Sequence, residues 1–103
     1  DQFSNPDPPD APSGLEGESG APARLSWQAS PSDQQVKVYR VYVSNSENGP
    51  FTLLGETTDT SYTLDKLTST GEHWFYVTAV NSGGESKPSQ IISLTVASPS
   101  SEP

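Results

Sequence analysis

The chain has 103 residues, which is enough for one domain with a single core. It carries 5 Lys and Arg against 13 Asp and Glu, a formal net charge of -8, which argues against partners that attract basic proteins, such as nucleic acid and anionic membranes. It has no cysteine, which excludes disulfides and thiolate metal sites, and no apolar run long enough to insert across a membrane.

Both ends of the chain have the composition of linkers. Residues 1–10, "DQFSNPDPPD", hold three prolines and three aspartates, and residues 98–103, "SPSSEP", are rich in Pro and Ser. Such segments favour extended, semi-rigid conformations. We therefore predict a domain over residues 11–97 with a linker on each side. The chain begins with Asp1 rather than Met, and we expect it to be part of a longer protein.

Between these ends, short segments of alternating apolar and polar residues are separated by turn residues, a pattern typical of all-β proteins. The dipeptide Asn48-Gly49 indicates a tight turn, residues 81–86, "NSGGES", are predicted to be a loop, and helical periodicity is absent. The pattern predicts a seven-stranded antiparallel β-sandwich. The predicted strands are residues 13–19, 23–29, 36–44, 51–56, 60–67, 73–80 and 90–96.

The alternation also assigns each strand an inward and an outward face, because successive strand residues point to opposite sides. Reversing the faces would lower the apolar content of the core side of each strand, so the register is well determined. The predicted core is Trp27, Tyr39, Val41, Tyr62, Leu64, Leu67, Phe75, Val77 and Leu94.

Several short motifs occur in a recognisable order: "AP" before Leu15, "LSW" with Trp27, "YRVYV", "TSYTL", Leu67, "VTAVN" ending at Asn81, and "GGES". Over residues 11–97 the chain resembles a fibronectin type III domain. An immunoglobulin domain would need a cysteine pair around the core tryptophan. The resemblance implies a Greek-key, immunoglobulin-like sandwich, with the first, second and fifth strands in one sheet and the remaining four in the other.

Within this family, the chain looks most like modules of secreted bacterial carbohydrate-degrading enzymes. That resemblance implies a non-catalytic spacer or docking module that is extracellular or at the cell surface, with neighbouring modules of the same chain as its partners. A glycoside hydrolase is one candidate for the parent protein. We expect no catalytic residue, no cofactor and no metal in this domain, because no nucleophile motif or second histidine is present. A monomer is expected, since Pro12 and Pro88 discourage pairing of the end strands.

The single histidine, His73, lies at the start of the sixth predicted strand. In the fibronectin type III pattern this position, counted from Leu67, usually holds the tyrosine of the tyrosine corner, whose hydroxyl bonds to upstream backbone. We predict that His73 and Leu67 form a structural corner, with an imidazole N–H in place of the phenol. A catalytic or metal-binding role is the less favoured alternative because no partner residue is apparent.

The outward face of the larger predicted sheet is the one surface whose residues suggest a binding function. By alternation, Arg40, Tyr42, Trp74, Tyr76 and Ile91 should share it. Such aromatics could bind a neighbouring module, another protein or, less favoured, a polysaccharide. This face is the basis of the alternative function, an adhesion or recognition module. The competing explanation is that Tyr and Trp are simply common at exposed strand positions.

Overall fold

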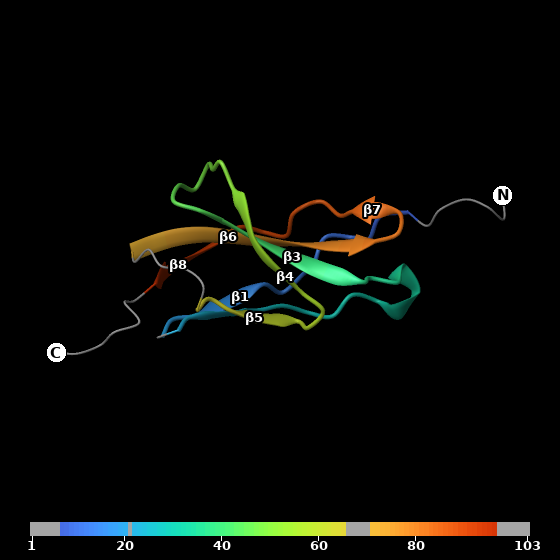
Figure 1. Ribbon diagram of the computed structural model, residues 1–103, viewed down its shortest axis with the longest axis horizontal. Helices are drawn as coiled ribbons and strands as arrows, with labels where there is room; N and C mark the ends of the chain where they lie inside the picture. Colours follow the sequence, from blue (N-terminus) through green and yellow to red (C-terminus); the bar gives the residue numbers. More distant parts are fainter. Residues whose placement is uncertain (1–6, 21, 66–70, 97–103) are drawn as a thin grey trace.

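The computed structural model describes residues 7–20, 22–65 and 71–96, which form two antiparallel β-sheets packed face to face (Figure 1). The order of the smaller sheet is β1-β2-β5, and that of the larger is β4-β3-β6, with β7 and β8 both pairing with the other side of β6. The predicted all-β sandwich is confirmed. The strands are β1 (Glu16–Glu18), β2 (Arg24–Ser26), β3 (Val38–Ser44), β4 (Thr52–Thr57), β5 (Ser61–Thr63), β6 (Gly71–Asn81), β7 (Gly84–Glu85) and β8 (Ile92–Val96), and one 3-10 turn, η1 (Ser32–Gln34), precedes β3.

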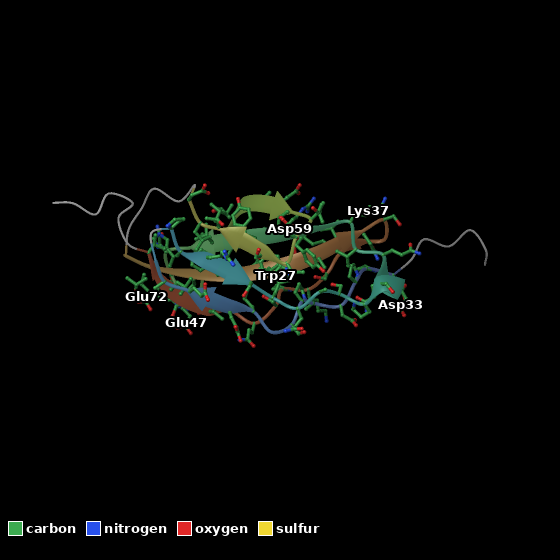
Figure 2. All side chains as sticks on the ribbon, turned by 90° about the horizontal axis from the view of Figure 1, so that it is seen from below. Trp27, Asp33, Lys37, Glu47, Asp59 and Glu72 are labelled. Carbon is green, nitrogen blue, oxygen red and sulfur yellow. The ribbon has the colours of Figure 1, made fainter. Side chains whose placement is uncertain are left out.

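The core lies between the sheets and is built by the period-2 alternation of the strands. Of the predicted core, Trp27, Tyr39, Val41, Leu64, Phe75 and Val77 are buried, and Tyr62 and Leu94 pack against them partly buried. Leu67 falls outside the described residues. Figure 2 shows Trp27 within the sandwich, while Asp33, Glu47, Asp59 and Glu72 lie on its outside.

The last strand of the sandwich is split in two. The sequence predicts one strand over residues 90–96 after a loop, whereas β7 and β8 pair with opposite ends of β6 and residues 86–91 lie between them. Two serines continue the ladder across this gap: the hydroxyl oxygens of Ser86 and Ser89 accept from the backbone N–H groups of Ala79 (2.9 Å) and Val77 (3.0 Å). Pro88 lacks an N–H and so cannot donate to the ladder at its own position.

Two glycines allow close approach of neighbouring elements. A Cβ at Gly17 in β1 would lie 2.6 Å from Leu94 of β8, so the glycine lets the edges of the two sheets meet. A Cβ at Gly55 in β4 would overlap the hydroxyl of Tyr62 from β5. A register shift in β4 falls beside this glycine, between the partners of Val41 and Tyr42. The shift turns Leu54 toward the core while Leu53 stays outward and 51% exposed.

Candidate functional site

Four of the five residues predicted to share the outer face lie on the two central strands of the larger sheet. Arg40 and Tyr42 belong to β3, and Trp74 and Tyr76 belong to β6. In the register, Tyr42 pairs with Tyr76, while Trp74 lies between Ser44 and Ser93. These four side chains are half-buried. Ile91 precedes β8 by one residue and is 46% exposed.

The tyrosines of this face stack on each other rather than lying flat on the sheet. The ring centroids of Tyr42 and Tyr76 are 4.8 Å apart at an interplanar angle of 27°, and Phe51 packs on Tyr76, also at 4.8 Å. Since neighbouring strands are themselves about 4.8 Å apart, rings that face each other across strands must stand upright on the sheet. Phe51, Tyr76 and Tyr42, here termed the aromatic row, therefore contact one another through their rings, and Tyr42 and Tyr76 each cover one ring face of the other.

Glu85 is the centre of a polar cluster beside the aromatic row. Its carboxylate accepts hydrogen bonds from the phenol of Tyr42 (2.5 Å) and the hydroxyl of Thr78 (2.7 Å). Arg40 bridges two acids, with its Nε 2.8 Å from Glu56 and its Nη1 3.3 Å from Glu85. Glu85 falls in a predicted loop and Phe51 in a predicted strand, and neither is predicted to lie on this face. No local signal could have found them, because each contact joins residues far apart in the chain.

The electrostatics of the cluster favour a charged carboxylate and a protonated phenol. Burial alone would raise the pKa of Glu85, but the hydrogen bonds from Tyr42 and Thr78 and the charge of Arg40 outweigh it and lower the pKa below its ordinary value. Burial, followed by the contact with Glu85, raises the pKa of Tyr42, and burial raises that of Tyr76. These charged and polar groups are hydrogen-bonded to one another, as is typical of a cluster that stabilises the fold.

His73 is buried on the inner face of β6, with 3% of its surface exposed. Its Nδ1 lies 3.0 Å from the carbonyl oxygen of Gly71 and, because a carbonyl only accepts, Nδ1 carries the proton in this contact. The imidazole therefore bonds to backbone two residues upstream. Its partner in the predicted corner, Leu67, is outside the described residues, so the corner itself stays a prediction.

Within residues 7–20, 22–65 and 71–96, no three His, Asp or Glu side chains come together as a metal site would require. In the same residues, no helix is long and apolar enough to cross a membrane.

A second cluster of contacts lies at the end of the sandwich where the described chain begins. The side-chain amide of Asn81, the last residue of β6, donates to the backbone carbonyls of Asp7 and Gln34, each at 2.8 Å. Asp10 and Gln34 bond to each other through two hydrogen bonds. Residues 7–12, here termed the N-terminal segment, therefore pack against the domain. The linker predicted for residues 1–10 is untested, but its residues 7–10 make these contacts.

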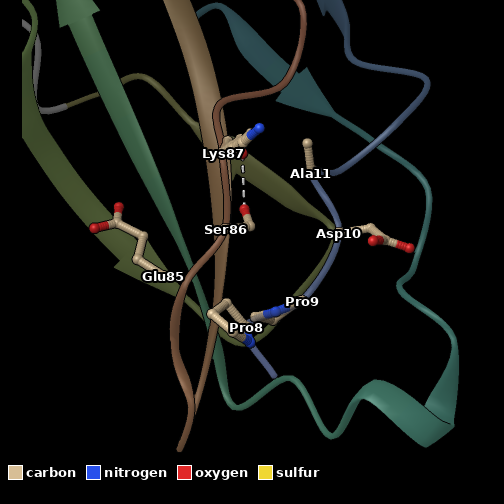
Figure 3. A pocket seen from close by; sticks show the side chains of 7 residues that line it. All are labelled: Pro8, Pro9, Asp10, Ala11, Glu85, Ser86 and Lys87. Carbon is tan, nitrogen blue, oxygen red and sulfur yellow. Dashed lines mark hydrogen bonds between the residues drawn. The ribbon is translucent and has the colours of Figure 1, made fainter. Parts of the chain in front are cut away.

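The N-terminal segment also forms one wall of a cavity of about 470 Å³. In Figure 3 this cavity lies between residues 8–11 on one side and Ser86 and Lys87 on the other. Its lining mixes proline rings with the charged Asp10, Glu85 and Lys87, and it holds no group of convergent polar side chains that would define a ligand.

Comparison with known proteins agrees with this architecture. A family model for the fibronectin type III domain matches residues 7–95. No curated protein matches the chain. Among solved structures, a Fn3-like protein from Clostridium thermocellum is 30% identical, with a TM-score of 0.72 over 84% of this chain and 91% of that one. A structure of titin kinase and its flanking domains is also 30% identical, with a TM-score of 0.70 over 82% of this chain and 16% of that chain. The fibronectin type III domain of human fibronectin type III domain containing protein 3 is 25% identical, with a TM-score of 0.70 over 97% of this chain and 99% of that one.

Proposed function

The chain belongs to the fibronectin type III family, and on that premise we propose that it is a stiff, non-catalytic spacer between modules of a secreted multidomain protein. Domains of this family are generally non-catalytic modules that act as linkers or interaction units in larger chains. The finer proposal is that the parent protein is a bacterial polysaccharide-degrading enzyme and that the domain is extracellular or at the cell surface. The support for this finer step is the resemblance of the "HWFYVTAVN" and "GGES" segments to such modules.

The observation that carries the spacer proposal is the position of the two ends of the described chain. Asp7 is bonded to Asn81, the last residue of β6, whereas Val96, the last residue of β8, pairs with Gly71, the first residue of β6. At about 3.3 Å per residue, the ten steps from Gly71 to Asn81 separate these points by about 33 Å. Figure 1 shows β7 and β8 toward opposite ends of β6 in the same way. The polypeptide therefore enters at one end of a rigid body and leaves at the other.

This geometry gives the mechanism of a spacer. A folded domain of fixed length holds its two neighbours apart, whereas a flexible chain of the same residue number would let them meet and separate freely. The separation sets the effective concentration of a catalytic module relative to a binding module on the same substrate. The titin kinase structure, whose chain is much longer than this one, is an example of a multidomain protein that contains a similar domain.

A second candidate is a recognition module that binds a neighbouring module, another protein or, less favoured, a polysaccharide through the Tyr42, Trp74 and Tyr76 face. The observation in its favour is the exposure of Leu53, which lies next to Tyr42 in the register and is 51% exposed. The observations against it are the stacking within the aromatic row, which occupies ring faces, and the pairing of the polar groups around Glu85. We therefore rank it below the spacer, with a monomer as the expected state in both cases.

Domain exchange in the full-length protein distinguishes these two functions. Residues 7–96 are replaced in one variant by an unrelated fibronectin type III domain of the same length, and in another by a Gly/Ser segment of the same residue number. A spacer predicts that activity on insoluble polysaccharide survives the first exchange and falls in the second. If both exchanges abolish activity, the surface of this domain is recognised and the recognition function is correct. If neither exchange changes activity, the spacer function is wrong.

A further inference from the structure

We propose that the N-terminal segment, residues 7–12, is docked on the domain and fixes the direction in which the preceding polypeptide leaves it. This inference rests on the spacer function and adds to it the geometry of the connection between the domain and the polypeptide before it. Proline-rich composition alone would predict a semi-rigid linker that pivots at the domain boundary. The contacts of residues 7–12 instead hold this part of the chain on the domain.

The first anchor of the N-terminal segment is the side chain of Asn81, a residue that is 5% exposed. It donates both amide hydrogens, one to the carbonyl of Asp7 and one to the carbonyl of Gln34, and its oxygen accepts from the N–H of Gly83 at 2.7 Å. Both donors and one acceptor site of the amide are thus used. One buried side chain therefore joins the N-terminal segment, η1 and the turn after β6.

The second anchor of the segment is the pair of hydrogen bonds between Asp10 and Gln34. The N–H of Asp10 donates to Oε1 of Gln34 at 3.0 Å, and Nε2 of Gln34 donates to Oδ2 of Asp10 at 2.8 Å. The backbone carbonyl of Gln34 accepts a hydrogen bond from Asn81, so Gln34 takes part in both anchors. Gln34 therefore links residue 10, through its side chain, to Asn81, through its backbone carbonyl.

The third contribution is the burial of the prolines in the segment. Pro9 and Pro12 are buried, and Pro8 lies beside Gly84, where an added Cβ would be 3.5 Å from the proline ring. Proline fixes its own φ near -65°, so the unfolded segment loses little conformational freedom when it docks. Hydrogen bonds at residues 7 and 10 and burial at residues 9 and 12 leave no two consecutive residues of the segment without an anchor.

Backbone ¹⁵N relaxation of the 103-residue chain measures this directly. The reporters are the amides of Asp10, Ala11 and Ser13, since the prolines have no N–H. The test variant is Gln34→Ala, because Gln34 is outside the core and its loss should not unfold the domain, whereas Asn81 is buried. The matched control is Gln90→Ala, an exposed glutamine in the segment between β7 and β8.

In the wild-type chain we expect order parameters at residues 10 and 11 close to those of β6, about 0.85, and in Gln34→Ala a fall to below about 0.6 with β6 unchanged. Gln90→Ala should match the wild type. Low order parameters at residues 10 and 11 in the wild type would overturn the docked segment, and no change in Gln34→Ala would overturn the anchoring of residues 10 and 11 by the Gln34 side chain. The domain-exchange test of the spacer function does not depend on the docking of residues 7–12, so the failure of this inference and the failure of the spacer function are distinguishable.

Discussion

Tyr42 donates a 2.5 Å hydrogen bond to the carboxylate of Glu85, a residue 43 positions later in the chain. The contact spans β6, which lies between the strands that carry the two residues. It ties the two-residue strand β7 to the centre of the larger sheet, and it uses the phenol that would otherwise be free for a ligand. The outer face is thus organised mainly by its own internal contacts.

Substitution of Glu85 by Gln should lower stability at neutral pH but not in acid. The pKa of Glu85 is lowered from its ordinary value of 4.5, so its charge stabilises the fold above that value, and the contribution is lost as the pH falls through the lower, folded-state pKa. Charged hydrogen bonds contribute about 1.5–3 kcal/mol, which we reduce to about 1 kcal/mol because the side chain is 32% exposed. Thermal unfolding from pH 3 to pH 8 measures the difference.

The control for this series is Glu72→Gln, since Glu72 is exposed on the same sheet. Its stability should follow the wild type throughout the pH range. A Glu85→Gln variant as stable as the wild type at pH 7, or a difference that persists unchanged at pH 3, would show that the carboxylate contributes no charge-dependent stability.

The hydroxyl of Tyr62 is buried without a hydrogen-bond partner among the described residues, and its removal should not destabilise the domain. An unpaired buried polar group costs free energy, so Tyr62→Phe should leave the melting temperature unchanged or raise it. Gly55→Ala, in contrast, should lower the free energy of unfolding by about 1–3 kcal/mol because the new methyl group overlaps that hydroxyl. Part of this loss should return in the double variant. Equal effects of Gly55→Ala with and without the hydroxyl would disprove the contact.

Substitution of His73 by Tyr tests the structural role predicted for this histidine. Tyrosine is the usual residue of the corner, so His73→Tyr should keep or raise the melting temperature. His73→Phe should lower the free energy of unfolding by about 1 kcal/mol, because it removes the hydrogen bond to Gly71. Collapse of the fold in His73→Tyr would mean that the imidazole makes a contact that tyrosine cannot, and the corner assignment would then be wrong.

The 103-residue chain should not bind polysaccharide. Its aromatic row is occupied by ring–ring contacts, so we expect no retention on insoluble polysaccharide and no change in tryptophan fluorescence with soluble polysaccharide. Trp27 is buried and Trp74 is half-buried on the outer face, so Trp74→Phe identifies the source of any change. Retention that disappears in Trp74→Phe would favour the recognition function over the spacer.

The architecture was predictable because it depends on local alternation. The pattern in residues 73–80 identifies both the core residues of β6, such as Phe75 and Val77, and its outward residues, Trp74 and Tyr76. Four of the five residues predicted for the outer face are on that face for the same reason. The family motifs then supplied the distribution of strands between the two sheets.

The contacts that organise the two candidate sites were not predictable, because each depends on pairing across the sheets. Alternation indicates that Tyr42 points outward, but not that Glu85 reaches it from a short strand in a predicted loop. Likewise, residues 7–10 have linker composition, and only their contacts with Asn81 and Gln34 reveal that they dock. The hydrogen bonds of Ser86 and Ser89 to β6 were equally unpredictable, because serine is a common loop residue and the sequence gives no sign of these contacts.

The distance between the two ends of the domain tests the spacer most directly. The chain has no cysteine, so the double variant Asp7→Cys and Thr95→Cys can be labelled specifically with spin labels. Asp7 is bonded to Asn81 and Thr95 pairs with Glu72, so the nine residue steps between them predict a backbone separation of about 30 Å. Pulsed electron paramagnetic resonance should give a narrow distribution near that value. A mean below about 20 Å, much less than the length of β6, or a broad distribution would contradict a stiff spacer that is entered and left at opposite ends.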